Sequence, residues 1–409
     1  MAERLQRYGC CIAGGGPAGM MLGLLLARAG VSVLVLEKHA DFLRDFRGDT
    51  IHPSTLEVIH ELGLLPELLT LPHQEVHLFN AQVGDTQVPF ADFTHLPTHA
   101  KFLAFMPQWD FLDFLAGKAS GYPTFHLWMR AEAQSLVEES GRVVGVKVAT
   151  PEGEREVRAD LVVGADGRRS TIRERAGLKV QELGAPMDVL WFRLGRLPSD
   201  PEASMGRFDP GRIFVLIYRG EHWQCGYVIP KGGIETVRAA GLDAFRASVV
   251  QAVPWARDRV AEIRTWDDVK LLTVQVDRVV RWYRPGLLLI GDAAHAMSPV
   301  GGIGINLALQ DAVAAANLLA APLAEGRLTV EDLAKVQKRR EWPTRVTQWF
   351  QVQVQKRIIA PVLGRSTSIR VPLVLRLLAR YPILRRIPAR LIGLGVRPEH
   401  VQSSLSTRG

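Results

Sequence analysis

The chain has 409 residues, 47% hydrophobic and 22% charged, which is the composition of a globular protein with room for two or three packed units. Its net charge of +8 lies in the tail, because residues 342–398 contain eleven Lys or Arg and no Asp or Glu. The rest of the chain is slightly acidic, which argues against nucleic-acid binding. The cysteines lack metal or disulfide spacing, and no apolar run reaches about 18 residues, so we expect a cytoplasmic protein without a signal peptide or spanning helix.

A β-α-β unit opens the chain. Residues 8–14 form a short apolar run typical of a buried strand, residues 16–30 predict a helix, and residues 31–38 predict a second strand. Two strands joined in this way by a helix predict a parallel sheet.

A glycine-rich turn, Gly14-Gly15-Gly16-Pro17-Ala18-Gly19, separates the first strand from the helix. Gly14 would permit the tight turn, Gly16 would let the backbone approach a pyrophosphate, and Gly19 would let the helix pack closely on the strand. The phosphates would accept hydrogen bonds from N–H groups at the helix N-terminus.

An acidic residue ends the second strand at the spacing that dinucleotide sites use. Glu37 follows Gly19 by 18 residues, so its carboxylate would bind ribose hydroxyls, and Lys38 lies next to it. The combined pattern predicts a dinucleotide site and leaves NAD and FAD both open.

The middle of the chain alternates between strand and helix patterns. Residues 52–69 and 106–119 predict helices, residues 76–90 predict strands joined by a Gly-Asp turn, and residues 141–167 predict a hairpin followed by a buried strand. Residues 186–274 differ, because strand-like runs separated by turns predict an antiparallel sheet in a separate unit.

The nucleotide-binding unit resumes after this sheet. Residues 286–294 return to a buried strand and residues 304–324 to a helix. We therefore expect an α/β fold with an interrupted Rossmann-like unit, a mainly antiparallel β-sheet unit and a helical C-terminal tail.

Two further glycine motifs each follow a predicted strand. Residues 164–173 (GADGRRSTIR) contain an Asp166-Gly167 turn, which on its own is most often only a turn. Residues 291–312 (GDAAHAMSPVGGIGINLALQDA) begin with Gly291-Asp292, where a carboxylate can meet a polyol, and continue through a glycine-rich loop into a helix N-terminus. Such a terminus favours negative charge on a bound group.

Together with Glu37, the three motifs resemble those of the single-component FAD-dependent monooxygenases of the para-hydroxybenzoate hydroxylase type. The resemblance covers residues 8–345, in the order and at the spacing of that family. It implies a FAD-binding domain of residues 1–75, 100–185 and 275–345, a substrate-binding β-sheet domain of residues 76–99 and 186–274, and a basic helical segment of residues 346–409.

The resemblance also implies roles for individual residues. Glu37 would hold the adenosine ribose, Asp292 the ribityl chain, and Asp166 would lie near the pyrophosphate. The backbone of residues 301–306 would meet the pyrimidine end of the flavin, and Pro299 would position the reactive edge. The residues expected to contact the cofactor are Gly14, Gly16, Pro17, Ala18, Gly19, Glu37, Lys38, Arg47, Gln108, Asp166, Gly291, Asp292, Gly301, Gly302, Gly304, Ile305 and Asn306.

The chemistry of such enzymes depends on the cofactor. NADH or NADPH reduces FAD, the reduced flavin forms a C4a-hydroperoxide with O2, and one oxygen atom passes to a small organic substrate, expected here to be aromatic, quinone-like or a polyketide. The sequence has no second strand–GxGxxG–helix unit, as is usual in the family. Because the cofactor supplies the reactivity, neither a catalytic triad nor a metal site is expected.

Three other functions remain open at this point. A reductase or dehydrogenase of the geranylgeranyl reductase type would share the cofactor site, and so would a flavin-bearing binding protein without turnover. A flavin-dependent halogenase is suggested by residues 223–230 (WQCGYVIP), which match a halogenase tryptophan motif only in part.

Several side chains permit two interpretations. His295 lies one turn after Asp292 and would be a catalytic base or, as we favour, a packing residue with a local hydrogen bond. The aromatic residues Trp223, Tyr227 and Phe214 would line a substrate pocket or pack in a core.

The basic tail is also ambiguous. Prolines divide residues 370–397 into short helices in which Arg alternates with Leu and Ile. Such a segment would bind anionic lipid at a membrane surface or cap the fold with its arginines in solvent, and we favour the cap. The sequence does not determine the oligomeric state.

Overall fold

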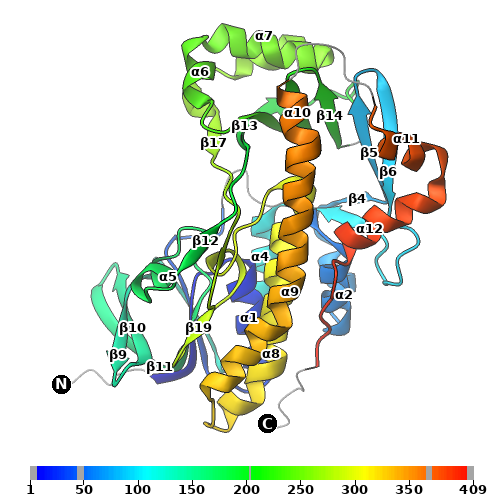
Figure 1. Ribbon diagram of the computed structural model, residues 1–409. Coiled ribbons are helices and arrows are strands. Elements are labelled where there is room, and N and C mark those ends of the chain that lie inside the picture. Colours follow the sequence, from blue (N-terminus) through cyan, green and yellow to red (C-terminus); the bar gives the residue numbers. More distant parts are fainter. Residues whose placement is uncertain (1–6, 44–49, 202–203, 365–370, 403–409) are drawn as a thin grey trace.

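The computed structural model describes residues 7–43, 50–201, 204–364 and 371–402. Two large β-sheets lie toward opposite ends of the molecule, and long helices connect them (Figure 1). This arrangement confirms the expected α/β fold with a second, mainly antiparallel sheet.

The larger sheet contains the predicted β-α-β unit and has eight strands. Its parallel strands lie side by side in the order β20 (Leu287–Leu289), β11 (Gly153–Gly164), β1 (Arg7–Ala13), β2 (Val33–Glu37) and β8 (Phe125–Met129). Antiparallel strands are added at one side, namely β19 (Tyr283–Arg284), β10 (Arg142–Thr150) and β9 (Glu132–Glu139).

Three helices pack together against this sheet. α1 (Pro17–Arg28) lies between α4 (Gln108–Ala119) and α8 (Ile303–Ala324), so ten of its twelve residues are buried. This burial explains why apolar residues surround α1 instead of forming one stripe. Three shorter helices complete this part: α2 (Pro53–Glu61), α3 (Leu65–Leu68) and α5 (Thr171–Arg175).

One stretch of the described chain, Val300–Ala324, is long and apolar enough to cross a membrane by length and composition. It consists of α8 and the turn before it, and 78% of its most apolar window is buried inside the protein. The burial identifies α8 as a core helix.

A long helix connects the two sheets. α9 (Val330–Val354) packs on α8 and continues through a π-helical turn, Gln355–Ile359, into α10 (Ala360–Leu363), which reaches the second sheet (Figure 1). The sequence patterns did not reveal this helix, and the predicted domain boundary after residue 345 falls inside it. The division into domains stays a prediction.

The second sheet has seven strands. Their order is β17 (Lys270–Leu272), β13 (Met187–Gly195), β16 (His222–Pro230), β15 (Arg212–Tyr218), β14 (Met205–Asp209), β5 (Leu78–Val83) and β6 (Thr86–Asp92). All neighbours are antiparallel except β14 and β5. Its outer face is covered by α6 (Ile234–Ala239), α7 (Leu242–Ala252) and the 3₁₀ segment Pro254–Glu262, which the sequence patterns did not reveal.

Two small sheets and the tail complete the fold. β3 (Thr50–Ile51), β7 (Leu103–Phe105) and β4 (Gln74–Val76) form one, and β12 (Val180–Glu182) pairs with β18 (Asp277–Val279). The tail contains α11 (Leu373–Arg380), a 3₁₀ turn (Pro382–Arg385) and α12 (Arg386–Gly393), which lie against β6 (Figure 1).

Candidate cofactor site

The three glycine motifs meet where adjacent parallel strands end. Gly14 donates its N–H to Leu36, Ala165 to Ala13 and Ile290 to Gly164, at 2.8–3.0 Å, so the hydrogen-bond ladder continues into the three turns. Ligands of open α/β sheets bind at this carboxyl edge. The motifs are therefore neighbours in space, although they lie far apart in the sequence.

Glycine is required where these turns touch. A Cβ on Gly14, which has φ +108°, would lie 2.4 Å from the carbonyl oxygen of Ala165. A Cβ on Gly291 would lie 3.0 Å from the Cβ of Ala308 and 3.2 Å from the Cβ of Ala18. The first two turns are thus packed backbone against backbone, and the third turn packs against α8 and α1.

Gly16 differs from these glycines, because a Cβ built on it would meet nothing within 4 Å. It precedes Pro17 at the N-terminus of α1, where no side chain of the described residues caps the helix. Exposed N–H groups beside open space suit an anionic ligand. This part of the chain therefore fits the pyrophosphate of a dinucleotide.

Glu37 lies at the end of β2 and is 9% exposed. Its carboxylate accepts hydrogen bonds from the N–H groups of Gly15 at 3.1 Å and His39 at 3.0 Å. These contacts fix the carboxylate beside the glycine turn. Lys38 follows with its side chain exposed.

Asp166 is tied into its own turn. Its carboxylate accepts from Ser170 Oγ at 2.5 Å and from the Ile172 N–H at 3.1 Å, and Ser170 caps α5. Burial raises the pKa of Asp166 above its usual value, although these hydrogen bonds oppose the shift. The carboxylate of Asp166 thus holds together the turn that lies at the carboxyl edge of the larger sheet.

Asp292 is the most accessible carboxylate of the third motif, with 32% of its side chain exposed. Arg168 lies 3.5 Å from it, and Arg173 donates to the carbonyl of Ala293 at 3.1 Å. Both arginines belong to the second motif, so they connect it to the third. Both lie in GADGRRSTIR, but the motif alone did not predict this role for them.

The loop from Pro299 to Gly304 is half-buried and lies at the start of α8. Gly301 and Gly302 have φ of +78° and +63°, and a Cβ on Gly302 would lie 2.2 Å from Thr50 Oγ1. No described side chain caps α8, so its first N–H groups remain available. A flat ring could approach this bare backbone, which lies next to half-buried Ile305.

Buried glutamines of α9 and of the π-helical turn after it hold residues 296–300, which lead into this loop. Gln351 donates to the carbonyls of Ser298 at 3.0 Å and Val300 at 3.1 Å, and accepts from the Ser298 N–H. Gln355 donates to Ser298 Oγ at 2.6 Å, and Gln348 to the Ala296 carbonyl at 3.2 Å. Their spacing of three and four residues on one helix face was a signal available in the sequence.

The Asn306 side chain serves the protein interior. Its Oδ1 accepts from the His52 N–H and from Thr55 Oγ1, both at 2.8 Å, and its Nδ2 donates to the Thr50 carbonyl at 3.0 Å. Any contact of Asn306 with the cofactor would therefore use its backbone. Burial lowers the pKa of His52 to about 4, so this histidine is neutral at physiological pH.

Two further cofactor contacts were predicted from the sequence, Gln108 and Arg47. Gln108 is the first residue of α4 and is half-buried. Arg47 lies outside the described residues.

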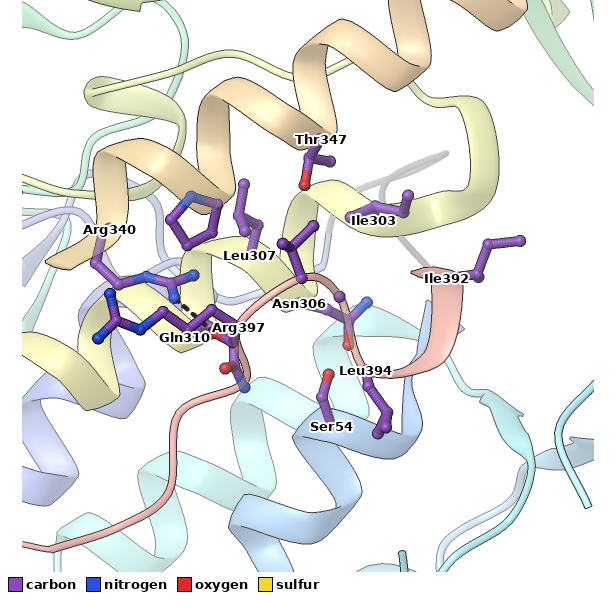
Figure 2. A pocket seen from close by; sticks show the side chains of 13 residues that line it. Ser54, Ile303, Asn306, Leu307, Gln310, Arg340, Thr347, Ile392, Leu394 and Arg397 are labelled. Carbon is purple, nitrogen blue, oxygen red and sulfur yellow. Dashed lines mark hydrogen bonds between the residues drawn. The ribbon is translucent and has the colours of Figure 1, made fainter. Parts of the chain in front are cut away.

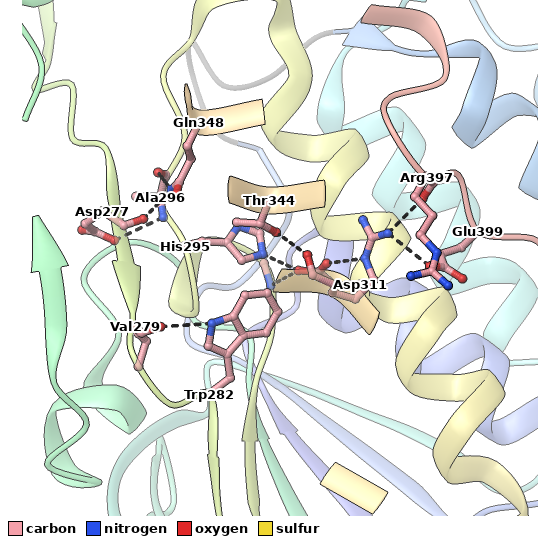
Figure 3. Close-up of polar contacts among 12 residues, drawn as sticks. Asp277, Val279, Trp282, His295, Ala296, Asp311, Thr344, Gln348, Arg397 and Glu399 are labelled. Carbon is pink, nitrogen blue, oxygen red and sulfur yellow. Dashed lines mark hydrogen bonds and ion pairs between the residues drawn. The ribbon is translucent and has the colours of Figure 1, made fainter. Parts of the chain in front are cut away.

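His295 lies in a buried polar network, not in an open site (Figure 3). Its Nε2 lies 2.5 Å from Asp311 Oδ2, and its ring centroid is 4.9 Å from that of Trp282. Asp311 also accepts from the Gly291 N–H at 3.1 Å. His295 is 1% exposed, and its contact with Asp311 ties the third motif to α8.

Arg340 of α9 connects this network to the tail. Arg340 donates from Nε to Asp311 at 2.9 Å, and from Nη1 to Glu399 and the Arg397 carbonyl, both at 3.1 Å (Figure 3). Burial alone would raise the pKa of Asp311, but His295 and Arg340 lower it below its usual value. Glu399 of the tail is therefore connected through Arg340 to Asp311, which lies in the third motif.

A small cavity lies beside this network, between α8, α9 and the tail (Figure 2). Its volume is about 20 Å³, which is room for one water. Asn306, Gln310 and Thr347 line it, and Gln310 Nε2 has no protein hydrogen-bond partner among the described residues. The cavity is too small for an organic substrate.

Two aromatic residues of the halogenase-like segment and one of β15 lie in a core. Trp223, Tyr227 and Phe214 pack beneath α7, and Trp223 is fully buried with its Nε1 donating to Asp200 at 2.9 Å. Among the described residues, no group of three or more His, Cys, Asp or Glu is arranged to hold a metal ion.

Comparison with known proteins agrees with this geometry. The family model described as "FAD binding domain" matches residues 7–349. The 6-methylpretetramide 4-monooxygenase of Streptomyces rimosus is 33% identical over 403 residues, covering 98% of this chain and 95% of that protein. The rifampicin monooxygenase of Streptomyces venezuelae is 30% identical, over 74% of this chain and 61% of that protein.

A solved structure shows the same architecture. The OxyS anhydrotetracycline hydroxylase from Streptomyces rimosus superposes with a TM-score of 0.76 and 26% identity, over 96% of this chain and 77% of that chain. The glycine motifs, the two-sheet fold and the extent of these matches agree. The chain belongs to the FAD-dependent monooxygenases of the para-hydroxybenzoate hydroxylase type, which use NAD(P)H as reductant.

Proposed function

We propose that this monooxygenase hydroxylates a polycyclic aromatic compound of the polyketide type. The observation that carries the proposal is the 33% identity with the 6-methylpretetramide 4-monooxygenase along nearly the whole of both chains. FAD, reduced by NAD(P)H, would activate O2 and supply one oxygen atom to the substrate. The work of the protein is to bind, orient and shield the reactants.

We assign the dinucleotide to the carboxyl edge of the larger sheet. The N–H groups after Gly16 would bind the pyrophosphate, Glu37 the adenosine ribose and Asp292 the ribityl chain. Residues 299–306 would hold the flavin ring through their backbone, and the glutamines of α9 would keep Pro299 in place. We also retain, as residues predicted from the sequence to contact the cofactor, Pro17, Ala18, Lys38, Arg47, Gln108, Asp166 and Gly291.

We place the substrate between this edge and the inner face of the second sheet. Val189, Ile213 and Val228 lie on that face, opposite the α7 side, and pack in the same cluster as Val300. Val300 adjoins Pro299, so the inner face begins next to the loop assigned to the flavin. This supports residues 76–99 and 186–274 as the substrate domain.

The assignment of Asp292 predicts that Asp292→Ala binds FAD roughly 10- to 100-fold more weakly, because a hydrogen bond to a charged group contributes about 1.5–3 kcal/mol. Titration of the apoprotein with FAD, followed by flavin fluorescence, measures the change. Asp243→Ala, at a carboxylate that is 94% exposed on α7, is the control. Equal affinities for the two variants would show that the ribityl contact is placed wrongly.

The activity predicts substrate-stimulated consumption of NAD(P)H and O2 in equal amounts. Purified protein should be screened against polycyclic phenols, quinones and aromatic polyketides, with mass spectrometry of the products. A product heavier by one oxygen atom, labelled from ¹⁸O2, supports the proposal. Product formation without O2 favours a reductase, halide-dependent product favours a halogenase, and no flavin reduction by NAD(P)H favours a binding protein.

We also propose a cytoplasmic location with contact to a membrane surface through the tail. The cysteines are free and buried, which suits a reducing compartment. The tail exposes apolar side chains among arginines, although its last residues cap the fold.

A further inference from the structure

The tail displays a concentrated apolar surface. Fourteen large hydrophobic side chains of the described chain are exposed, and half of them lie between residues 373 and 391. We call this set, with its neighbouring arginines, the tail face: Leu373, Val374, Leu377, Tyr381, Ile383, Ile387 and Leu391, with Arg376, Arg380, Arg386 and Arg390. A patch of this kind marks an interaction site.

The helices of the tail face are fixed to the protein by their other side. Ala389, Ile392 and Leu394 pack in one cluster with Phe93 and Leu96, which follow β6. Arg385 closes the end of α11, donating to the carbonyls of Leu378 at 2.8 Å and Ala379 at 2.7 Å. The exposed side chains are therefore held outward by a packed scaffold.

The exposed apolar side chains and the arginines form adjoining strips. On α11, Leu373 and Leu377 are one turn apart, and Arg376 and Arg380 are one turn apart beside them. On α12, Ile387 and Leu391 are exposed next to Arg390. Short helices of this pattern lie in the plane of a membrane interface.

The positive charge of the tail face favours an anionic binding partner. No Asp or Glu occurs in residues 342–398, and Arg376, Arg380 and Arg390 make no ion pair with a described residue. A second copy of the chain would bring the same cations against them, whereas an anionic bilayer offers acyl chains for the apolar strip and negative headgroups for the arginines.

We propose that the tail face docks on the surface of an anionic phospholipid membrane. Leu373, Leu377, Ile383 and Ile387 enter the interface, and Arg376, Arg380 and Arg390 contact the headgroups. This docking does not depend on the substrate, so it stands or falls separately from the proposed reaction.

Vesicle sedimentation of the full-length holoprotein tests the proposal. Wild-type protein should bind vesicles of phosphatidylcholine mixed with phosphatidylglycerol far better than vesicles of phosphatidylcholine alone, and salt should weaken the binding. The triple variant Arg376→Gln/Arg380→Gln/Arg390→Gln should bind on the order of 100-fold more weakly, since each arginine near an anionic surface contributes roughly fivefold.

Apolar variants separate lipid binding from charge alone. Ile383→Ser/Ile387→Ser should lose binding to the anionic vesicles, whereas the control Leu197→Ser/Leu271→Ser, at exposed leucines outside the tail, should retain it. Thermal melting and flavin content would establish that each variant is folded. Equal binding by all variants, or no binding by the wild type, overturns the proposal. So does a wild-type dimer in light scattering that Ile383→Ser/Ile387→Ser dissociates.

Discussion

Replacing Gly16 by valine is expected to abolish FAD binding while leaving the apoprotein as stable as the wild type. The backbone at Gly16 has φ −74° and ψ −177°, which valine adopts readily, and no atom obstructs a Cβ. In the holoprotein, the added side chain would fill the space assigned to the pyrophosphate. Loss of contacts worth about 3 kcal/mol lowers FAD affinity by about 100-fold or more, measurable by FAD titration.

Two glycine variants serve as controls for this result. A Cβ on Gly19 would lie 1.9 Å from the Gly14 carbonyl oxygen, so Gly19→Ala should destabilise even the apoprotein, by about 1–3 kcal/mol in urea unfolding. Gly117→Ala, in open space on α4, should leave FAD binding unchanged and should not destabilise the apoprotein, since alanine favours a helix over glycine. If Gly16→Val still binds FAD like the wild type, the phosphates bind elsewhere.

Arg340→Met is expected to cause the largest loss of stability, about 3–5 kcal/mol in the free energy of unfolding. The guanidinium is 1% exposed and lies between the carboxylates of Asp311 and Glu399, which are also buried. Methionine fills similar space but leaves both charges without their shared partner. Urea unfolding followed by tryptophan fluorescence measures the effect.

Arg345→Met, on the same helix, is the matched control. Its guanidinium is 62% exposed and pairs with Glu341 at 3.7 Å, so the stability should change by no more than about 0.5 kcal/mol. Arg340→Lys should recover only part of the loss, because an ammonium group cannot reproduce the rigid fork of two donors. Equal stability of the two methionine variants would rule out a supporting role for the buried network.

Local patterns were sufficient to predict the fold class. The strand, glycine turn and helix of residues 8–30 are adjacent in sequence, and their backbone geometry depends on a few glycines. The same holds for the hairpin that joins β10 and β11. Periodicity over short windows carries this information.

Partners that come from distant segments could not be predicted in this way. Asp311 and Arg340 are 29 residues apart, and Arg340 and Glu399 are 59 apart, so only the packing of α9 and the tail brings them together. The backbone of Asn306 was predicted to meet the flavin, but motif spacing gave no sign that Thr50, His52 and Thr55 bind its side chain. Motif spacing identifies a loop and does not show which way each side chain turns.

The tail contacts also have a consequence for the order of events during synthesis. The ribosome releases the glycine turn at Gly16 first, the turn at Gly291 much later, and Glu399 after both. Until Glu399 arrives, Arg340 has Asp311 as a partner but lacks its second carboxylate, so we expect this ion pair to remain exposed to water in the nascent chain. We therefore expect FAD to be captured only after Glu399 has left the ribosome and paired with Arg340.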